Sequence, residues 1–195
     1  MSRAPDRLSG LPSQTVGPFF HLGLTGNSAL GRLAGPEARG ERIRLRFRLL
    51  DGDDLPVPDG IIELWQADAS GKYNHPADTQ DRAPDPAFCG FGRLATGADG
   101  ICTFDTIRPG RAPDGLGTCQ AAHISVSVFA RGLLDRLSTR VYFAGDPALA
   151  EDPVLLRVPK DRRQTLIAQP DPMSAGCWEF DVHLQGERET VFFDI

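Results

Sequence analysis

Two kinds of side chain in this sequence carry the ring nitrogen or phenol oxygen that metal sites and acid–base sites commonly use. Four histidines and two tyrosines occur among the 195 residues: His21, His75, His123, His183, Tyr73 and Tyr142. The sequence fingerprints of serine hydrolases, phosphate-binding loops, zinc proteases and dinucleotide-binding folds do not occur. Any metal or acid–base site must therefore draw on these few rings.

Two short segments hold the residues of greatest interest. Tyr73 and His75 lie in a turn at residues 71–75, and His123 and Ser125 alternate along a predicted strand, which places them on one face. Taken alone, such residues are usually a packed ring, a surface imidazole and a hydrogen-bonded core histidine. The alternative is a self-sufficient catalytic site around Tyr73, His75 and His123, which metal analysis of the isolated chain would reveal.

Strands are expected to position these residues, because proline and glycine recur throughout and interrupt long helices. In residues 42–49 arginine alternates with aliphatic or aromatic residues, which is the two-residue period of a strand with one buried face. Further strands are predicted at residues 61–65, 101–104, 123–129, 140–143, 178–184 and 190–193. One helix is predicted at residues 161–168, and a turn or two at residues 148–156. This pattern predicts an all-β fold with short helices, built as a sandwich or a barrel.

The first forty residues differ from the rest of the chain. They are rich in glycine and carry no strand pattern, so we expect residues 1–40 to form an irregular arm and residues 41–195 to form the β domain. Phe19 and Phe20 give this arm apolar surface, which favours packing against another subunit.

Composition excludes several classes of partner. The net charge of −5 and the pI near 5.3 do not attract a phosphate backbone or an anionic membrane surface. No apolar run approaches the ~20 residues that span a bilayer, and no signal-peptide pattern opens the chain, so we expect a cytoplasmic protein. The cysteines form no C-x-x-C pair and are expected to be small core residues with free thiols, with a zinc site from distant segments as the alternative: Cys89, Cys102, Cys119 and Cys177.

An ordered series of segments resembles the intradiol ring-cleavage dioxygenases. These are residues 59–67 (DGIIELWQA), 71–75 (GKYNH), 91–93 (FGR), 106–110 (TIRPG), 122–124 (AHI) and 142–147 (YFAGDP). The resemblance implies a β-sandwich core and a non-haem Fe(III) centre held by two tyrosines and two histidines. Tyr73 and His123 match one ligand of each kind. Ala112 and Ser125 stand where the second tyrosine and the second histidine belong, and Gln120 replaces an arginine of the family pattern.

The absence of two ligands implies that this chain contributes no metal ligand and no catalytic residue. Its segments at residues 12–20, 128–134 and 184–194 resemble the iron-free α subunits of the family, which pair with an iron-bearing β subunit of the same fold in a hetero-oligomer. The implied reaction of the pair is cleavage of protocatechuate by O2 to 3-carboxy-cis,cis-muconate in the β-ketoadipate pathway. The resemblance assigns the Fe(III) to the β subunit.

The same resemblance assigns three residues of this chain to substrate binding in the partner's pocket. Gly17 and Pro18 match an N-terminal segment that walls this pocket, and Arg131 is a candidate to pair with the substrate carboxylate. Their alternative interpretation is an ordinary Gly-Pro turn and a surface arginine. For the whole chain, the alternative is a decayed paralogue that acts as a binding or structural module.

Overall fold

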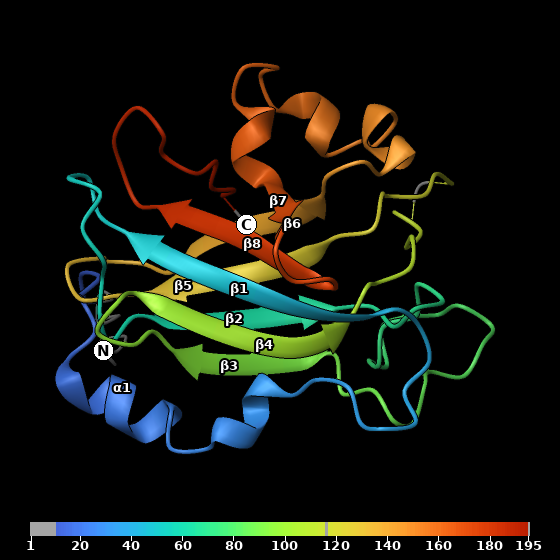
Figure 1. Cartoon of the computed structure of the whole chain (residues 1–195), viewed down its shortest axis with the longest axis horizontal. Helices are drawn as coiled ribbons and strands as arrows, with labels where there is room; N and C mark the ends of the chain where they lie inside the picture. The colour runs from blue at the N-terminus through green and yellow to red at the C-terminus, as the bar shows by residue number, and fades with distance from the viewer. Residues whose placement is uncertain (1–10, 116, 195) are drawn as a thin grey trace, which may run out of the picture.

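The molecule is built mainly from β-strands (Figure 1), as shown by a computed structural model that describes residues 11–115 and 117–194. Among these residues, eight strands are hydrogen-bonded in the order β3-β2-β5-β6-β7-β8-β1-β4. They are β1 (Arg42–Leu50), β2 (Ile61–Gln66), β3 (Phe91–Ala95), β4 (Ile101–Ile107), β5 (Ile124–Phe129), β6 (Leu137–Phe143), β7 (Ile167–Pro170) and β8 (Cys177–His183). The prediction of an all-β fold with little helix is confirmed.

The strands form two layers with the hydrophobic core between them. One layer contains β4, β1, β8 and β7, the other contains β3, β2, β5 and β6, and a short parallel pairing of β6 with β7 joins the two. Phe143 of β6 meets Trp178 of β8 with ring centroids 5.1 Å apart. Because one continuous buried cluster takes side chains from both layers, the arrangement is a β-sandwich closed along one edge.

The alternating arginines of β1 lie on the solvent face of this sandwich. The apolar residues between them are buried, as the period of two predicts. Arg44 pairs with Asp105 of β4, and Arg46 and Arg48 pair with acidic residues of the parallel neighbour β8. Since these exposed arginines already have partners within the chain, they do not form a free basic stripe.

The helix predicted at residues 161–168 is wrong. A short 3₁₀ helix, η4 (Arg163–Leu166), takes its place, and β7 begins directly at Ile167. Pairing with β6 extends the backbone there, and the Thr165 hydroxyl bonds to the carbonyl of Arg162, which competes with regular helix formation. The expected turns at residues 148–156 are confirmed as η2 (Pro147–Ala150) and η3 (Leu155–Arg157).

The strand predictions differ from the structure at two further places. The strand predicted at residues 190–193 is absent, although this segment bonds singly to neighbouring backbone, for example through the Phe193 amide to the carbonyl of Ser138. No ladder forms because its contacts go to different elements. Strand β3 was not predicted, since its glycine interrupts the apolar alternation.

The N-terminal arm contains two helices and part of the core. Helix α1 (Pro18–Leu24) begins at a proline, whose fixed backbone angle suits the first helical position, and the 3₁₀ helix η1 (Ser28–Gly31) follows. Leu33, beyond η1, is only 1% exposed and belongs to the central cluster. Helix α1 buries no residue completely and touches the sandwich where the ring of Phe20 lies 5.4 Å from that of Phe129.

The cysteines correct another expectation. Cys102 is buried and burial raises the pKa of its thiol to about 12, but Cys89 and Cys119 are exposed and Cys177 is half-buried. The description as small core residues therefore holds for Cys102 only, because Cys89 and Cys119 lie outside the strands and Cys177 is the first residue of β8, at the edge of the core. All four are unpaired thiols. Within residues 11–115 and 117–194, no helix has the length and apolarity to span a bilayer.

Phe47 provides a test of the packing between strands. It is fully buried and meets Phe104 and Phe180 edge-on, at centroid distances of 5.8 and 5.7 Å. Phe47→Ala should lower the free energy of unfolding by about 3–5 kcal/mol in urea denaturation, because it leaves a cavity between three strands. Arg46→Ala, on the exposed face of the same strand, should cost about 1 kcal/mol or less. Equal losses for the two variants would contradict this description of the core.

Candidate functional site

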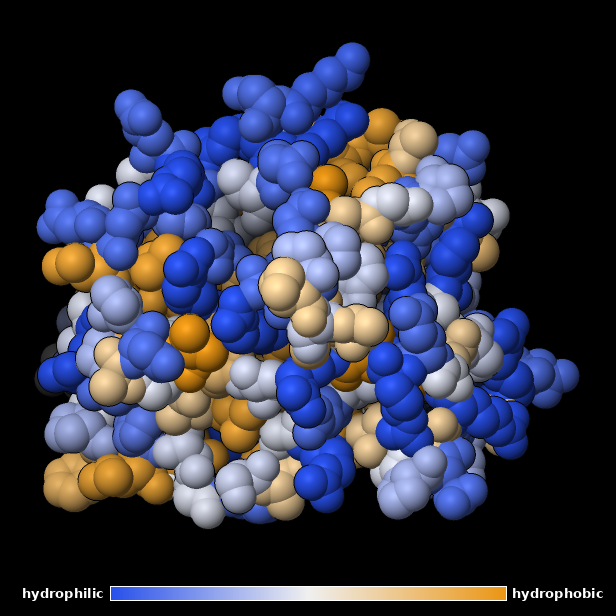
Figure 2. Space-filling model, in the orientation of Figure 1, coloured by the Kyte–Doolittle hydropathy of each residue, from blue (hydrophilic) through white to orange (hydrophobic). Residues whose placement is uncertain are grey.

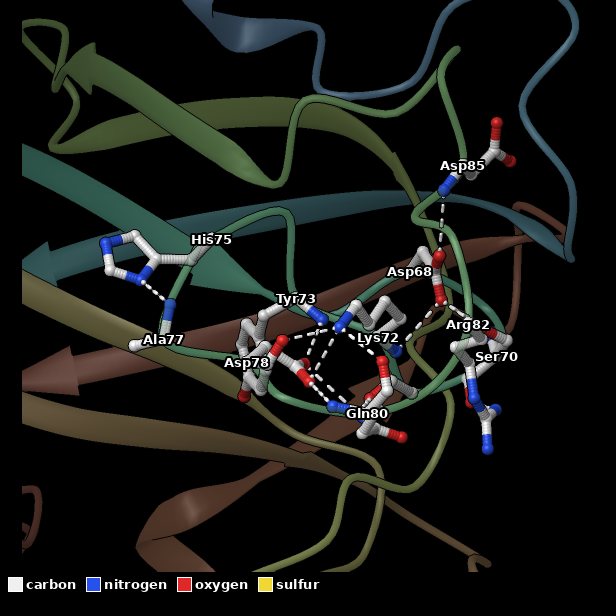
Figure 3. A network of polar contacts seen from close by, with 11 residues as sticks. Asp68, Ser70, Lys72, Tyr73, His75, Ala77, Asp78, Gln80, Arg82 and Asp85 are labelled. Carbon is white, nitrogen blue, oxygen red and sulfur yellow. Dashed lines mark hydrogen bonds and ion pairs between the residues drawn. The ribbon is translucent and has the colours of Figure 1, made fainter.

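The loop that carries Tyr73 is held by a buried ion pair (Figure 3). The ammonium of Lys72 donates to a carboxylate oxygen of Asp78 at 3.0 Å and to the carbonyls of Asp78 and Gln80 at 2.7 and 3.0 Å. The other carboxylate oxygen of Asp78 accepts the Tyr73 amide at 2.8 Å. Burial raises the pKa of Asp78, but hydrogen bonds from the Gln80 and Tyr73 amides and from Lys72 outweigh it and hold this pKa at about 2.

Asp68 anchors both ends of the same loop. One carboxylate oxygen accepts the amides of Ser70 and Lys72, and the other accepts the amide of Asp85 at 3.1 Å. Gly71 has φ +83, and a Cβ atom there would overlap the carbonyl oxygen of Arg111. The turn therefore requires glycine, and it presses the Tyr73 loop against the segment that contains Ala112.

Tyr73 and His123 lie beside each other, as their match to iron ligands predicts. The Tyr73 hydroxyl is 3.4 Å from His123 Nε2, and His123 Nδ1 is 2.8 Å from the carbonyl oxygen of Ala121. Since a carbonyl only accepts, Nδ1 carries the hydrogen and Nε2 presents a lone pair to the phenol. Burial, followed by the charge of Arg140, lowers the pKa of His123 to about 4, and burial raises the pKa of Tyr73. Both rings are neutral at pH 7.

The position of a second histidine ligand is taken by Ser125, and a cation faces it. Ser125 on β5 pairs directly with Arg140 on β6, and the Arg140 guanidinium donates to the side-chain oxygen of Gln120. This guanidinium is close enough to His123 to disfavour a second positive charge there. Sequence reasoning missed Arg140. The only available signal was its place on a predicted strand, and the cross-strand pairing that gives it meaning is not visible in the sequence.

These donors do not fit ferric iron. Ala112 is buried and offers no oxygen, Ser125 offers no imidazole, and the two remaining rings interact with each other. Ferric iron is a hard cation that favours anionic oxygen ligands, whereas the positive charge of Arg140 repels a cation. Within the described part of the chain, no group of three or more histidine, cysteine or acidic residues is placed to bind a metal.

His75 does not join Tyr73 and His123. Its ring packs edge-on against Trp65, with centroids 6.2 Å apart, and its Nδ1 accepts the Ala77 amide at 3.1 Å. Trp65 also stacks on the ring of Tyr73, with ring centroids 5.9 Å apart and ring planes inclined by 17°. His75 thus contacts Trp65 and the backbone of its own turn, whereas Tyr73 contacts Trp65 and His123.

Gly17, Pro18 and Arg131 lie near one another at a different place. Gly17 caps α1 ahead of Pro18, both are exposed, and a Cβ atom on Gly17 would meet nothing within 4 Å. Arg131 pairs with Asp59 at 3.2 Å, and His21 of α1 contacts the Asp59 carbonyl oxygen. This group adjoins the start of β2, whereas the Tyr73 loop follows the end of β2. The strand separates the two groups by roughly 17 Å.

Comparison with known proteins places this arrangement in a family. A family model described as a dioxygenase matches residues 16–186. Protocatechuate 3,4-dioxygenase alpha chains from Pseudomonas putida and Burkholderia cepacia are 41% and 40% identical over 94% and 96% of this chain, and over 95% and 98% of their own lengths. The beta chain from Burkholderia cepacia is 37% identical over 91% of this chain and 77% of its own length.

Solved structures agree with these sequence relatives. The dioxygenase domain of a carbohydrate-binding fusion protein from Streptomyces sp. SirexAA-E superposes with a TM-score of 0.62 at 26% identity, covering 90% of this chain and 97% of that domain. An intradiol ring-cleavage dioxygenase from Tetranychus urticae has a TM-score of 0.55 at 20% identity, over 78% and 84% of the two chains, and supports the fold. This chain belongs to the intradiol ring-cleavage dioxygenase family.

Proposed function

We propose that this chain is the iron-free α subunit of a protocatechuate 3,4-dioxygenase. Together with an iron-bearing β subunit of the same fold, it cleaves protocatechuate with O2 to 3-carboxy-cis,cis-muconate in the β-ketoadipate pathway. The observation that carries the proposal is the Tyr73–His123 pair, in which two former ligand positions bond to each other beside Ala112 and Ser125. The similarity to alpha chains over almost their whole length supports it.

The N-terminal arm supplies a surface for that partner. In α1, Phe19 and Leu22 are 84% and 66% exposed, and apolar surface is visible at the lower left of Figure 2, where α1 lies in Figure 1. Side-chain and backbone bonds hold residues 13–15 to the β5–β6 turn, beside the exposed Leu134. We propose that the arm, assigned to residues 1–40, packs on the β subunit through this surface. Residues 1–10 lie outside the described chain.

Gly17, Pro18 and Arg131 are proposed to reach the partner's substrate pocket. They lie at the opposite end of β2 from this chain's own Tyr73 and His123, so substrate contact by them serves another subunit. The backbone at Gly17 can approach a ring closely, and the Arg131 guanidinium can pair with the carboxylate of protocatechuate. The iron chemistry that prepares the ring for O2 belongs to the β subunit, and this chain positions the ring and excludes water.

A cytoplasmic location is part of the same proposal. The four cysteines are free thiols, two of them exposed, and a reducing compartment preserves such thiols.

Measurement of iron content tests which subunit binds the metal. This chain purified alone should contain negligible iron and lack the colour of tyrosinate bound to Fe(III), because its donors do not fit the metal. Pull-down from the native host should recover a homologous chain that carries the iron. One ferric ion per isolated chain, or recovery of this chain as a homogeneous protein without any such partner, would refute the proposal. The second result would favour a decayed paralogue.

Gly17→Val tests contact with the partner's pocket. The side chain meets no atom of this chain, so folding should be unaffected, whereas crowding of the substrate costs ~1–3 kcal/mol. The complex should show a rise in KM for protocatechuate of roughly ten-fold or more with unchanged iron content. Gly26→Val is the matched control, because it also meets nothing within 4 Å but lies beyond α1. A wild-type KM in both variants would leave Gly17 and Pro18 as an ordinary turn.

Arg131→Ala tests recognition of the carboxylate. Its pair with Asp59 is exposed, so stability should change little. Loss of a charge-assisted contact should raise KM for protocatechuate by roughly ten-fold while leaving turnover of unsubstituted catechol nearly unchanged. If both substrates are affected equally, Arg131 acts on assembly rather than on the carboxylate.

A further inference from the structure

A large cavity lies over the outer face of strands β2, β5 and β6. Its volume is about 850 Å³, and η3 and the C-terminal segment close its sides. The rings of Trp65 and Phe91 and the side chains of Val154, Val158 and Val191 form apolar walls. Ordinary small-molecule sites have volumes of roughly 300–1,000 Å³, so the space holds a ring-sized ligand.

Three arginines line this cavity without acidic partners. Among the described residues, no salt bridge joins Arg136, Arg140 or Arg157 to a carboxylate. Two acidic residues also line it. Glu63 is engaged by Arg93, with 2.6 Å between the charged groups, and Asp194 is exposed near the chain end. The chain has a net charge of −5, but these arginines make the cavity locally positive, which favours binding of an anion there.

Arg140 is the best placed of the three. Its bond to Gln120 orients the guanidinium, and Ser125 on the neighbouring strand adds a hydroxyl to the same wall. Arg140 therefore supplies a positive charge at this wall of the cavity on a planar fork of hydrogen-bond donors.

We propose that this cavity binds a small aromatic carboxylate without any metal. The carboxylate accepts hydrogen bonds from Arg140 and from the Ser125 hydroxyl, and the ring lies along Trp65. No bond is made or broken, so the cavity is a ligand site and not a second catalytic centre. This site is distinct from the Gly17, Pro18 and Arg131 group, and its occupancy does not depend on the proposed role of that group.

Calorimetric titration of the full chain tests the site with benzoate and with benzamide, its neutral counterpart of the same shape. Benzoate should bind at least roughly ten-fold more tightly than benzamide, and its affinity should fall as ionic strength rises. This comparison requires no variant. Equal affinities, or no measurable binding of benzoate by the folded chain, would overturn the proposal.

Arg140→Gln should weaken benzoate binding by roughly ten-fold or more and leave benzamide binding nearly unchanged. Arg48→Gln is the matched control, since it removes the same charge from the far layer, and it should retain wild-type affinity. Near-ultraviolet circular dichroism verifies the fold of each variant, and Arg157→Gln provides a second, more exposed change that should also weaken benzoate. If Arg48→Gln weakens benzoate binding by a similar factor, the effect comes from the overall charge of the protein and not from this cavity, and the proposal is refuted.

Tryptophan fluorescence locates the ligand. The chain has two tryptophans, and Trp65 lines the cavity whereas Trp178 is buried in the core. Benzoate should change the emission of the wild type, and Trp65→Phe should abolish that change. A change that persists in Trp65→Phe would place the ligand elsewhere and contradict the proposal. These results are independent of iron content and of partner recovery, so failure here is distinguishable from failure of the α-subunit assignment.

Discussion

Packing between the two sheet layers is the constraint on which the rest of the molecule depends. Phe47 is fully buried in the core and contacts Phe104 and Phe180 from neighbouring strands of its own layer, and the contact of Phe143 on β6 with Trp178 on β8 joins the two layers. A core of this kind tolerates little change of volume, so the strands keep fixed positions and the loops at their ends vary. The chain can thus lose the chemistry of its family at the ends of β2 and β5 and still keep the family fold.

The substitutions at the former metal position form a consistent electrostatic set. In the proposed iron-free subunit, Ala112 and Ser125 take the places of a phenolate and an imidazole, and Tyr73 and His123 form a neutral hydrogen-bonded pair. Arg140 then provides a positive charge without a metal. This charge belongs to a side chain, so no metal ligands are needed to retain it. It also repels a metal cation and makes metal binding at this position unfavourable.

The Tyr73 loop and the N-terminal arm lie at opposite ends of strand β2. The Tyr73 loop, stabilised by the buried pair of Lys72 and Asp78, lies at one end of β2, and the exposed arm with Gly17 and Arg131 lies at the other. A rigid strand between them prevents both from acting on one ligand. In the proposed assembly, the end of this chain with the arm faces the catalytic pocket of its neighbour, while the outer face of β2, β5 and β6 carries a cavity of its own.

The sequence by itself determined the all-β class and the amphipathic strand β1, because both depend on local period, and its ordered motifs predicted that two iron ligands are absent, because that prediction depends on residue identity. It also predicted that Tyr73 and His123 lie together. The failures concern long-range contacts. The predicted helix is replaced by η4 and by β7, whose residues Ile167 and Ala168 pair with β6, and three cysteines lie outside the core. Arg140 acquires its role only through pairing with Ser125 across two strands, and the cavity it lines exists only when β2, β5, β6 and the C-terminal segment meet. Such contacts depend on how the chain closes in space, which short-range patterns do not encode.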